Sequence, residues 1–287
     1  MLTKILGIVL VAGTAMATNV DLAVAFNYDI GAKVPEKQVM LIKKGLTIAE
    51  DYLNKIYGGA IPRGVANNIT VKIEATGKGN QEPGGGGGAA TGLDETGPRP
   101  YFDVAHVQWA QNTEGRGWTR ETDQLKTVVH EYTHGWQAWL GVLDMHSQPL
   151  GNWMNEGIAE YIAYNAIIAT GKMSKRNADR FMLNASSGEE TASPLKAFGS
   201  SRTSAWPGHV GYVAIDWLVS ESPNGPMSLR ILATEVAGGR SVKQAFAKAF
   251  NIELDDFYEQ FEVWRPAIRK SPGKALSRRP KLVNIGE

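Results

Sequence analysis

The sequence contains no cysteine, so the chain forms neither disulfides nor thiolate metal sites. Any metal centre must therefore be built from histidine and carboxylate side chains. Histidine is itself scarce, with five residues in a chain of 287. They stand at His106, His130, His134, His146 and His209. This short set leaves few combinations from which a metal site can be assembled.

The chain also lacks an excess of charge of either sign. The formal net charge is +1, so no strong field marks a nucleic acid or an acidic membrane surface as a partner. The basic residues Arg278, Arg279 and Lys281 are a local cluster, and we expect residues 271–287 to be a solvated tail. An apolar content of 43% and a charged content of 21% are typical of a globular protein.

Long apolar runs are missing as well. The apolar run from Ile5 to Ala12 follows Lys4 and is too short for a stable membrane span. Ala15-Met16-Ala17 is typical of a signal-peptide cleavage site. We therefore expect a signal peptide over residues 1–17, cleaved before Thr18. The mature protein is then secreted or periplasmic, without stable membrane insertion; an uncleaved anchor or a buried first strand is the alternative.

Hydrophobic periodicity predicts strands in the first part of the chain, beside one helix. Apolar residues from Val39 to Ile56 recur at steps of three and four, which predicts a helix with one buried face. Ile69–Ile73 and residues 100–109 alternate between apolar and polar, so each predicts a strand. Residues 76–100 are glycine-rich and predict a flexible surface loop; a loop that moves near a substrate cleft is the sharper alternative.

Beyond residue 119 the patterns are mostly helical. The expected helices cover residues 122–140, 155–170, 174–184, 209–220, 228–237, 241–250 and 253–265. Residues 18–34 are expected to be a lead into the mature chain. Strands followed by helices indicate an α+β fold. We expect an N-terminal subdomain over 18–145, with a small mixed sheet and an active-site helix, and a mostly helical subdomain over 146–270.

The segment His130-Glu131-Tyr132-Thr133-His134 fits the pattern H-E-x-x-H on one of the predicted helices. Side chains four residues apart lie on the same helical face, so the two imidazoles converge on one metal ion. Glu131, between them, is placed to accept a proton from the water that attacks a carbonyl group. The pattern therefore predicts a hydrolytic zinc centre.

A third ligand follows in residues 153–161, which read WMNEGIAEY. A catalytic zinc ion takes three protein ligands and keeps one open position. Glu156, on a helix that crosses the first one, is the candidate for the third ligand. Glu160 stands one turn later on the same face, where it is a candidate acceptor for the outer ring nitrogen of His130.

The segments HEYTHGWQ and NWMNEGIAEY resemble the gluzincin zinc peptidases, most closely the peptidase-MA-like families and the plant basic secretory proteins. In those proteins a histidine-glutamate helix, an E-G-I-A-[DE]-Y helix and a G-Y-x-x-A helix succeed one another. The third helix motif stands here at Gly211–Ala214. The resemblance spans about residues 100–265. It implies a zincin-like fold and a zinc-dependent peptidase that acts on a peptide or protein.

Carried over residue by residue, the resemblance assigns roles to five residues of the motifs. It implies His130, His134 and Glu156 as the ligands of Zn²⁺, with Glu131 as the general base. Glu160 is implied as the residue that supports a ligand from behind. The chain has no G-x-M-E-N motif, which captures the free amine of the substrate in the aminopeptidases. An endopeptidase is therefore favoured over an exopeptidase.

Two further features of a peptidase site remain open in the sequence. Tyr212 and His209 stand three residues apart, and both are candidates for stabilising negative charge on the substrate carbonyl oxygen. Core packing is the alternative for Tyr212. The predicted strand over 100–109 is the best candidate for an edge that pairs with an extended peptide. The alternative functions are a non-catalytic zinc-containing binding module and a zinc hydrolase that acts on a non-protein amide.

Overall fold

The computed structural model describes residues 25–57, 68–79, 88–94, 97–109, 113–143, 151–188, 193–199, 207–275 and 279–283. The predicted signal peptide over residues 1–17 lies outside these ranges, as does most of the glycine run at 84–88. No helix within the described ranges combines the length and the apolar character needed to cross a membrane.

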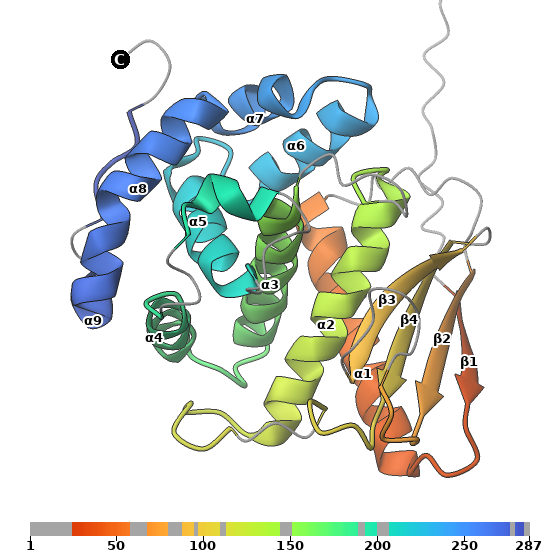
Figure 1. The fold of residues 1–287 in the computed structure, drawn as a ribbon. Coiled ribbons are helices and arrows are strands. Elements are labelled where there is room, and N and C mark those ends of the chain that lie inside the picture. The colour runs from red at the N-terminus through yellow and green to blue at the C-terminus, as the bar shows by residue number, and fades with distance from the viewer. Residues whose placement is uncertain are drawn as a thin grey trace, which may run out of the picture.

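Four short strands form one mixed sheet, in the order β1-β2-β4-β3. They are β1 (Ala25–Ile30), β2 (Asn68–Glu74), β3 (Ala89–Asp94) and β4 (Gly97–Asp103). β2 runs parallel to both β1 and β4, whereas β3 is antiparallel to β4. β1 and β3 are thus the two edges, and β3 is the edge next to the helix α2 (Figure 1).

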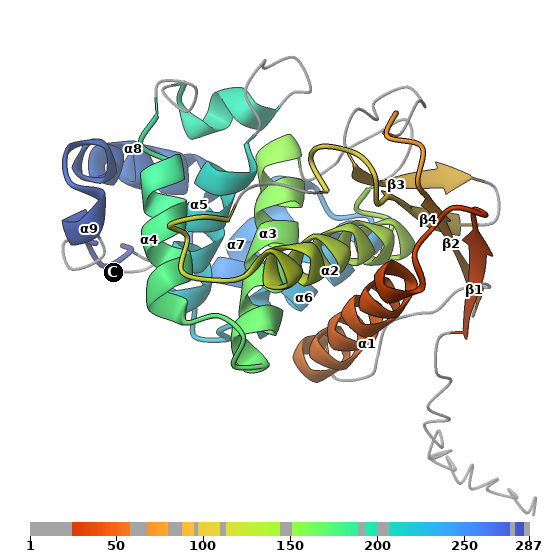
Figure 2. The same cartoon turned by 90° about the horizontal axis from the view of Figure 1, so that it is seen from below.

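The other described elements are helices, and they make up most of the chain beyond residue 119 (Figure 1). They are α1 (Glu36–Tyr57), α2 (Arg120–Trp139), α3 (Asn152–Ala169), α4 (Lys175–Ala185), the 3-10 helix η2 (Leu195–Gly199), α5 (Gly208–Glu221), α6 (Met227–Ala237), α7 (Val242–Phe250), α8 (Leu254–Lys270) and α9 (Pro272–Ala275). α1 and α2 lie side by side between the sheet and the other helices (Figure 2). The predicted α+β class, with a small mixed sheet followed by a mostly helical half, is confirmed.

The sheet differs from the sequence-based expectation at three places, of which the first is β1, a strand within the lead expected over residues 18–34. The strand expected over 100–109 ends at Asp103, and it is the interior strand β4. Its expected role as a peptide-binding edge is therefore wrong. The edge beside α2 is β3, which lies within the segment expected to be a loop. Its sequence AATGLD has little strand propensity of its own, and pairing with β4 holds it extended.

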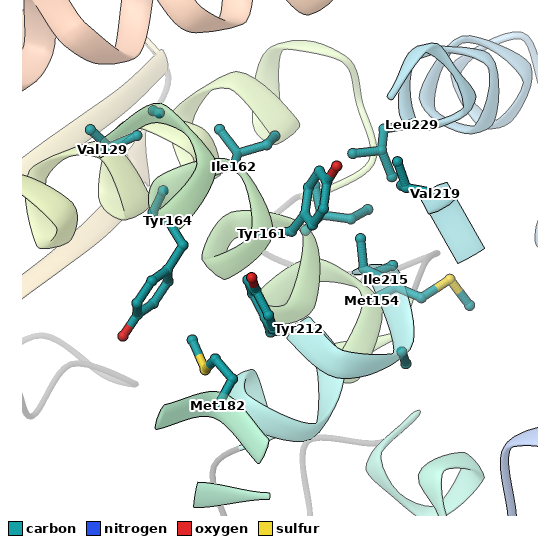
Figure 3. Close-up of a cluster of buried hydrophobic side chains, with 14 of the residues drawn as sticks. Val129, Met154, Tyr161, Ile162, Tyr164, Met182, Tyr212, Ile215, Val219 and Leu229 are labelled. Carbon is teal, nitrogen blue, oxygen red and sulfur yellow. The ribbon is translucent and has the colours of Figure 1, made fainter. Parts of the chain in front are cut away.

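One cluster of buried hydrophobic side chains runs through both expected subdomains. The part shown in Figure 3 brings together Val129, Met154, Tyr161, Ile162, Tyr164, Met182, Tyr212, Ile215, Val219 and Leu229. These residues come from α2, α3, α4, α5 and α6. The boundary expected near residue 145 thus does not separate two cores, because α2 from the first half packs directly on α3 from the second.

Two glycines explain how closely α3 and α5 approach. A Cβ atom added to Gly157 would lie 2.5 Å from the backbone carbon of Gly211, and one added to Gly211 would lie 2.5 Å from the carbonyl oxygen of Trp153. Any larger residue at either position would push the helices apart. This contact fixes α3, and hence Glu156 next to Gly157, against the helical half of the molecule.

The C-terminal segment is not the solvated tail that the charge pattern predicts. Ala275 and Leu282 are buried. Arg279 pairs with Asp216 of α5, with its Nη1 atom 3.1 Å from Oδ2, and it also donates to Ser220 at 2.7 Å. The basic charge of Arg279 is therefore neutralised by α5, and the described part of this segment belongs to the folded body.

Asp103, at the end of β4, accepts hydrogen bonds from two neighbouring segments of the backbone. Its carboxylate accepts a hydrogen bond from the Thr76 hydroxyl at 2.7 Å. It also accepts from the backbone N–H groups of Thr76, Gly77, Gly79 and Ala105 at 3.0–3.1 Å. Burial raises the pKa of Asp103, but these donors together outweigh it and hold the pKa at about 2.

We expect Asp103→Asn to lower the free energy of unfolding at neutral pH by about 1–3 kcal/mol, because it leaves buried donors without an acceptor. The folded-state pKa of Asp103 lies below the ordinary value of 3.8, so this carboxylate stabilises the fold above that value and ceases to do so as the pH falls through about 2. Urea unfolding at a series of pH values measures both effects. The exposed Asp51→Asn is the control, and an equal loss in the control would contradict the prediction.

Candidate metal centre

The helix α2 carries three of the residues at the centre, and its start is well defined. The hydroxyl of Thr119 accepts a hydrogen bond from the backbone N–H of Thr122, which caps the helix. Glu121 and Asp123 place negative charge in the first turn, where it favours the helix dipole. The helix is buried along most of its length. This packing holds the motif over residues 130–134 in a single orientation.

The side chains of His130, His134 and Glu156 converge. The two Nε2 atoms of the histidines lie 3.1 Å apart. The Oε2 atom of Glu156 lies 3.4 Å from the first and 3.5 Å from the second. Ligand atoms about 2.0–2.1 Å from a zinc ion, at tetrahedral angles, lie about 3.3–3.4 Å from one another. The triangle therefore fits Zn²⁺, and among the described residues it is the one such group of metal-ligating side chains.

Glu156 reaches the triangle from the first turns of α3. This helix follows Gly151, whose φ of 73° is a left-handed conformation that glycine adopts without strain. α3 then packs along α2. The side chain of Glu156 is 21% exposed, against 8% for His130. The three ligand atoms are thus largely shielded by protein, while the carboxylate keeps contact with solvent.

A buried ion pair supports His130 from behind. Its Nδ1 atom lies 3.0 Å from Oε1 of Glu160, and the Nζ atom of Lys126 lies 3.2 Å from the same oxygen. Burial raises the pKa of Glu160, but Lys126 and His130 lower it to about 2. Glu160 thus lies where the sequence predicts. Lys126 was not predicted, although it stands one helical turn before His130 and so shares its face.

His134 is supported by an amide. Its Nδ1 atom lies 2.8 Å from Oε1 of Gln137, which is 1% exposed. The Nε2 atom of Gln137 donates to the backbone carbonyl of Asn155 at 2.9 Å. Sequence reasoning missed Gln137, whose one signal is its spacing of three residues from a ligand. Both histidines therefore have an oriented outer nitrogen, as histidine ligands of metals usually do.

Of the three converging side chains, the two histidines bind protons strongly, whereas burial raises the pKa of Glu156 but their charge outweighs this and lowers it. Burial lowers the pKa of His130, but hydrogen bonds to Glu156 and Glu160 raise it to about 10. Burial also lowers the pKa of His134, and the charge of Glu156 raises it above its ordinary value. A metal ion that binds here must displace these protons, so its affinity depends on pH.

Glu131 lies beside the triangle and against the edge of the sheet. The hydroxyl of Thr91, on β3, lies 2.7 Å from the backbone carbonyl oxygen of Glu131 and 3.3 Å from its Oε2 atom. Glu131 is 8% exposed. The strand β3 thus holds the residue that the sequence predicts as the base. Thr91 was not predicted, because the pattern of residues 76–100 is typical of a loop.

The structure does not support Tyr212 as a donor to the substrate. Its hydroxyl donates to Oδ1 of Asp179 on α4 at 3.2 Å. Its ring packs against Tyr161 and Tyr164 in the core (Figure 3), and the residue is 2% exposed. The physical reason is that this face of α5 is turned toward α3 and α4. Tyr212 is a core residue, the alternative that the sequence left open.

His209, one turn before Tyr212 on α5, has different partners. Its ring packs edge-on against Phe181 at 5.5 Å between centroids. It also interacts electrostatically with Glu160, the carboxylate that supports His130. Burial lowers the pKa of His209 to about 4, so the ring is uncharged at neutral pH.

The centre thus brings together three convergent atoms that could hold a metal ion, the carboxylate of Glu131 against Thr91, and contacts that orient the two imidazoles. Neither the protein-family models nor the curated proteins that were compared with the chain gave a match.

Proposed function

We propose that this protein is a zinc-dependent metallopeptidase of the gluzincin type, with a zincin-like fold, and that it is secreted or periplasmic. The observation that carries the proposal is the triangle of ligand atoms from His130, His134 and Glu156, with edges of 3.1–3.5 Å. Its dimensions match a tetrahedral zinc centre with one position left for a substrate or water. An endopeptidase is favoured.

The residues around the triangle have separate tasks in peptide hydrolysis. A zinc ion held there supplies Lewis acidity, which polarises a carbonyl group and lowers the pKa of water. Glu131 accepts the proton of the attacking water and returns it to the nitrogen of the leaving amine. The Thr91 hydroxyl, 3.3 Å from Oε2 of Glu131, helps to orient this carboxylate. Glu160 and Gln137 hold the two imidazole rings in place.

The strand β3 is the proposed binding edge for the substrate. β4 pairs with one side of β3, and no other described strand pairs with the opposite side. An edge of this kind presents backbone groups that an extended peptide can pair with. Thr91 connects this strand directly to Glu131. A peptide bound along β3 would therefore pass the base, which makes a peptide bond the natural target.

We expect His209→Ala to lower kcat by about 10²–10³-fold with little change in KM, because negative charge that develops on the carbonyl oxygen loses a donor. Tyr212→Phe is the matched comparison on the same helix. It should leave kcat unchanged and lower the free energy of unfolding by about 1 kcal/mol, through loss of the hydrogen bond to Asp179. Steady-state kinetics on a cleaved peptide measure both. A larger loss of kcat in Tyr212→Phe would reverse the assignment.

Incubation of the zinc-loaded protein with a peptide library, followed by mass spectrometry, tests the proposed activity. We expect new peptide termini that disappear when a zinc chelator is added and return when zinc is restored. A wild-type protein that binds zinc and cleaves no peptide would contradict the peptidase. That outcome would favour a non-catalytic binding module or a hydrolase of non-protein amides.

A further inference from the structure

We infer that Gln137 is a positioning residue that fixes the tautomer of His134 and ties this ligand to the helix that carries Glu156. The inference rests on the proposed zinc centre and adds to it a residue beyond the H-E-x-x-H pattern of residues 130–134. It follows from which atoms can donate and which can only accept in the two buried hydrogen bonds that link His134, Gln137 and Asn155.

The first contact sets the orientation of the amide. The Gln137 amide lies 2.9 Å from the backbone carbonyl oxygen of Asn155. A carbonyl oxygen only accepts hydrogen bonds, so the amide must present its NH₂ group there. The amide oxygen consequently faces the opposite way, toward Nδ1 of His134 at 2.8 Å. With the side chain 1% exposed, bulk water does not compete for either group.

The second contact sets the tautomer of the ligand. The amide oxygen of Gln137 also only accepts, so Nδ1 of His134 must carry a proton. In a neutral imidazole, a proton on Nδ1 leaves the lone pair on Nε2. Nε2 is the atom that lies 3.1 Å from Nε2 of His130 and 3.5 Å from Oε2 of Glu156. Gln137 therefore selects the tautomer that presents a lone pair to a metal ion.

The two ligand histidines are supported by groups of different charge. His130 has the carboxylate of Glu160 behind it, and Lys126 neutralises that carboxylate. Behind His134, the amide of Gln137 orients the ring without adding another negative charge to a buried site. An ionised side chain at that position would require a counter-ion of its own. The amide of Gln137 thus orients the His134 ring at a smaller desolvation cost than a carboxylate would.

The same amide couples the positions of two ligands. Asn155, whose backbone carbonyl oxygen accepts the hydrogen bond from Gln137, immediately precedes Glu156 in α3. A shift of α3 along α2 would break this hydrogen bond and move the carboxylate of Glu156 at the same time. The orientation of the His134 ring and the place of the third ligand are therefore held by one side chain.

Three variants test this inference by zinc affinity, measured by competition with a chromophoric chelator, and by NMR of the imidazole N–H groups in zinc-loaded protein. Gln137→Met keeps the length of the side chain and removes both polar atoms. Gln137→Glu keeps an acceptor for Nδ1 of His134. Gln124→Met is the matched control, because Gln124 is also buried on α2 and donates to the carbonyl of Trp109 at 3.2 Å.

We expect Gln137→Met to lower zinc affinity by about 10–100-fold. It should also lose the slowly exchanging Nδ1–H resonance of His134. Gln137→Glu should keep this resonance, because a carboxylate still accepts from Nδ1, but it should recover only part of the affinity because the donor to Asn155 is lost. Gln124→Met should bind zinc as the wild type does. Wild-type affinity and an unchanged resonance in Gln137→Met would overturn the inference and leave the metal centre standing. Loss of the Nδ1–H resonance in Gln137→Glu as well would overturn it, because an acceptor for Nδ1 would then not be what fixes the tautomer. A wild type that binds no zinc would overturn the metal centre itself.

Discussion

Glu131→Gln is expected to lower kcat for peptide hydrolysis by about 10²–10⁴-fold while the protein retains its zinc. Glutamine has the same length and can still lie against the Thr91 hydroxyl, so the local structure should persist. Its amide cannot accept the proton of the attacking water. Parallel measurement of kcat and of zinc content on the same preparation separates loss of the base from loss of the metal.

The control for this substitution is Glu121→Gln, an exposed residue in the first turn of the same helix. It removes one negative charge from α2 without touching the centre, and kcat should stay close to that of the wild type. Activity that survives in zinc-loaded Glu131→Gln would show that another group takes the proton. The role of Glu131 as the general base would then be wrong.

Removal of a zinc ligand is the second change with a large expected effect. We expect His134→Ala and Glu156→Ala each to weaken zinc binding by about 10²–10⁴-fold, an order of magnitude that assumes the three ligands share the binding free energy evenly. Peptide cleavage should be lost with the metal. Elemental analysis after dialysis against a weak chelator gives the zinc content of each variant.

His106→Ala is the matched control for the histidine variant. His106 lies in the turn after β4, where its Nδ1 atom accepts a hydrogen bond from the backbone N–H of Gln108. It takes no part in the triangle of ligand atoms, so His106→Ala should keep one zinc ion per chain. Equal zinc content in wild type, His134→Ala and Glu156→Ala would place the metal elsewhere on the protein.

The residues that the sequence predicted best are those whose arrangement has a local cause. His130 and His134 share a helical face because they are four residues apart. Glu156 and Glu160 are likewise one turn apart, so one predicted helix carries both. The structure brings all four side chains together. Helical spacing paired the residues within each helix, and the H-E-x-x-H pattern with its need for a third ligand predicted that the two pairs converge.

The contacts that sequence reasoning missed depend on how helices cross. Lys126 and Gln137 stand at helical spacings from the two ligands, but each is defined by a partner on α3. A sequence does not show where along α3 the crossing falls. The backbone contact between Gly157 and Gly211 helps to set the position of α3, and it becomes visible only when both helices are placed.

The position of the sheet edge could not be predicted from the sequence either, because it depends on tertiary contacts. The same holds for the choice between Tyr212 and His209. β3 is extended because β4 pairs with it, and its small residues give no alternating pattern. Residues three apart on a helix point about 60° from one another. Because of this difference in direction, Tyr212 contacts Asp179, whereas His209 interacts with Glu160. Helical periodicity in the sequence does not distinguish these two directions.

X-ray diffraction from crystals of the protein at the zinc absorption edge tests the central claim most directly. The predicted result is one anomalous peak per chain, about 2.0–2.2 Å from Nε2 of His130, Nε2 of His134 and an oxygen of Glu156. A peak bound by other residues, or no peak in crystals grown with zinc, would contradict the account.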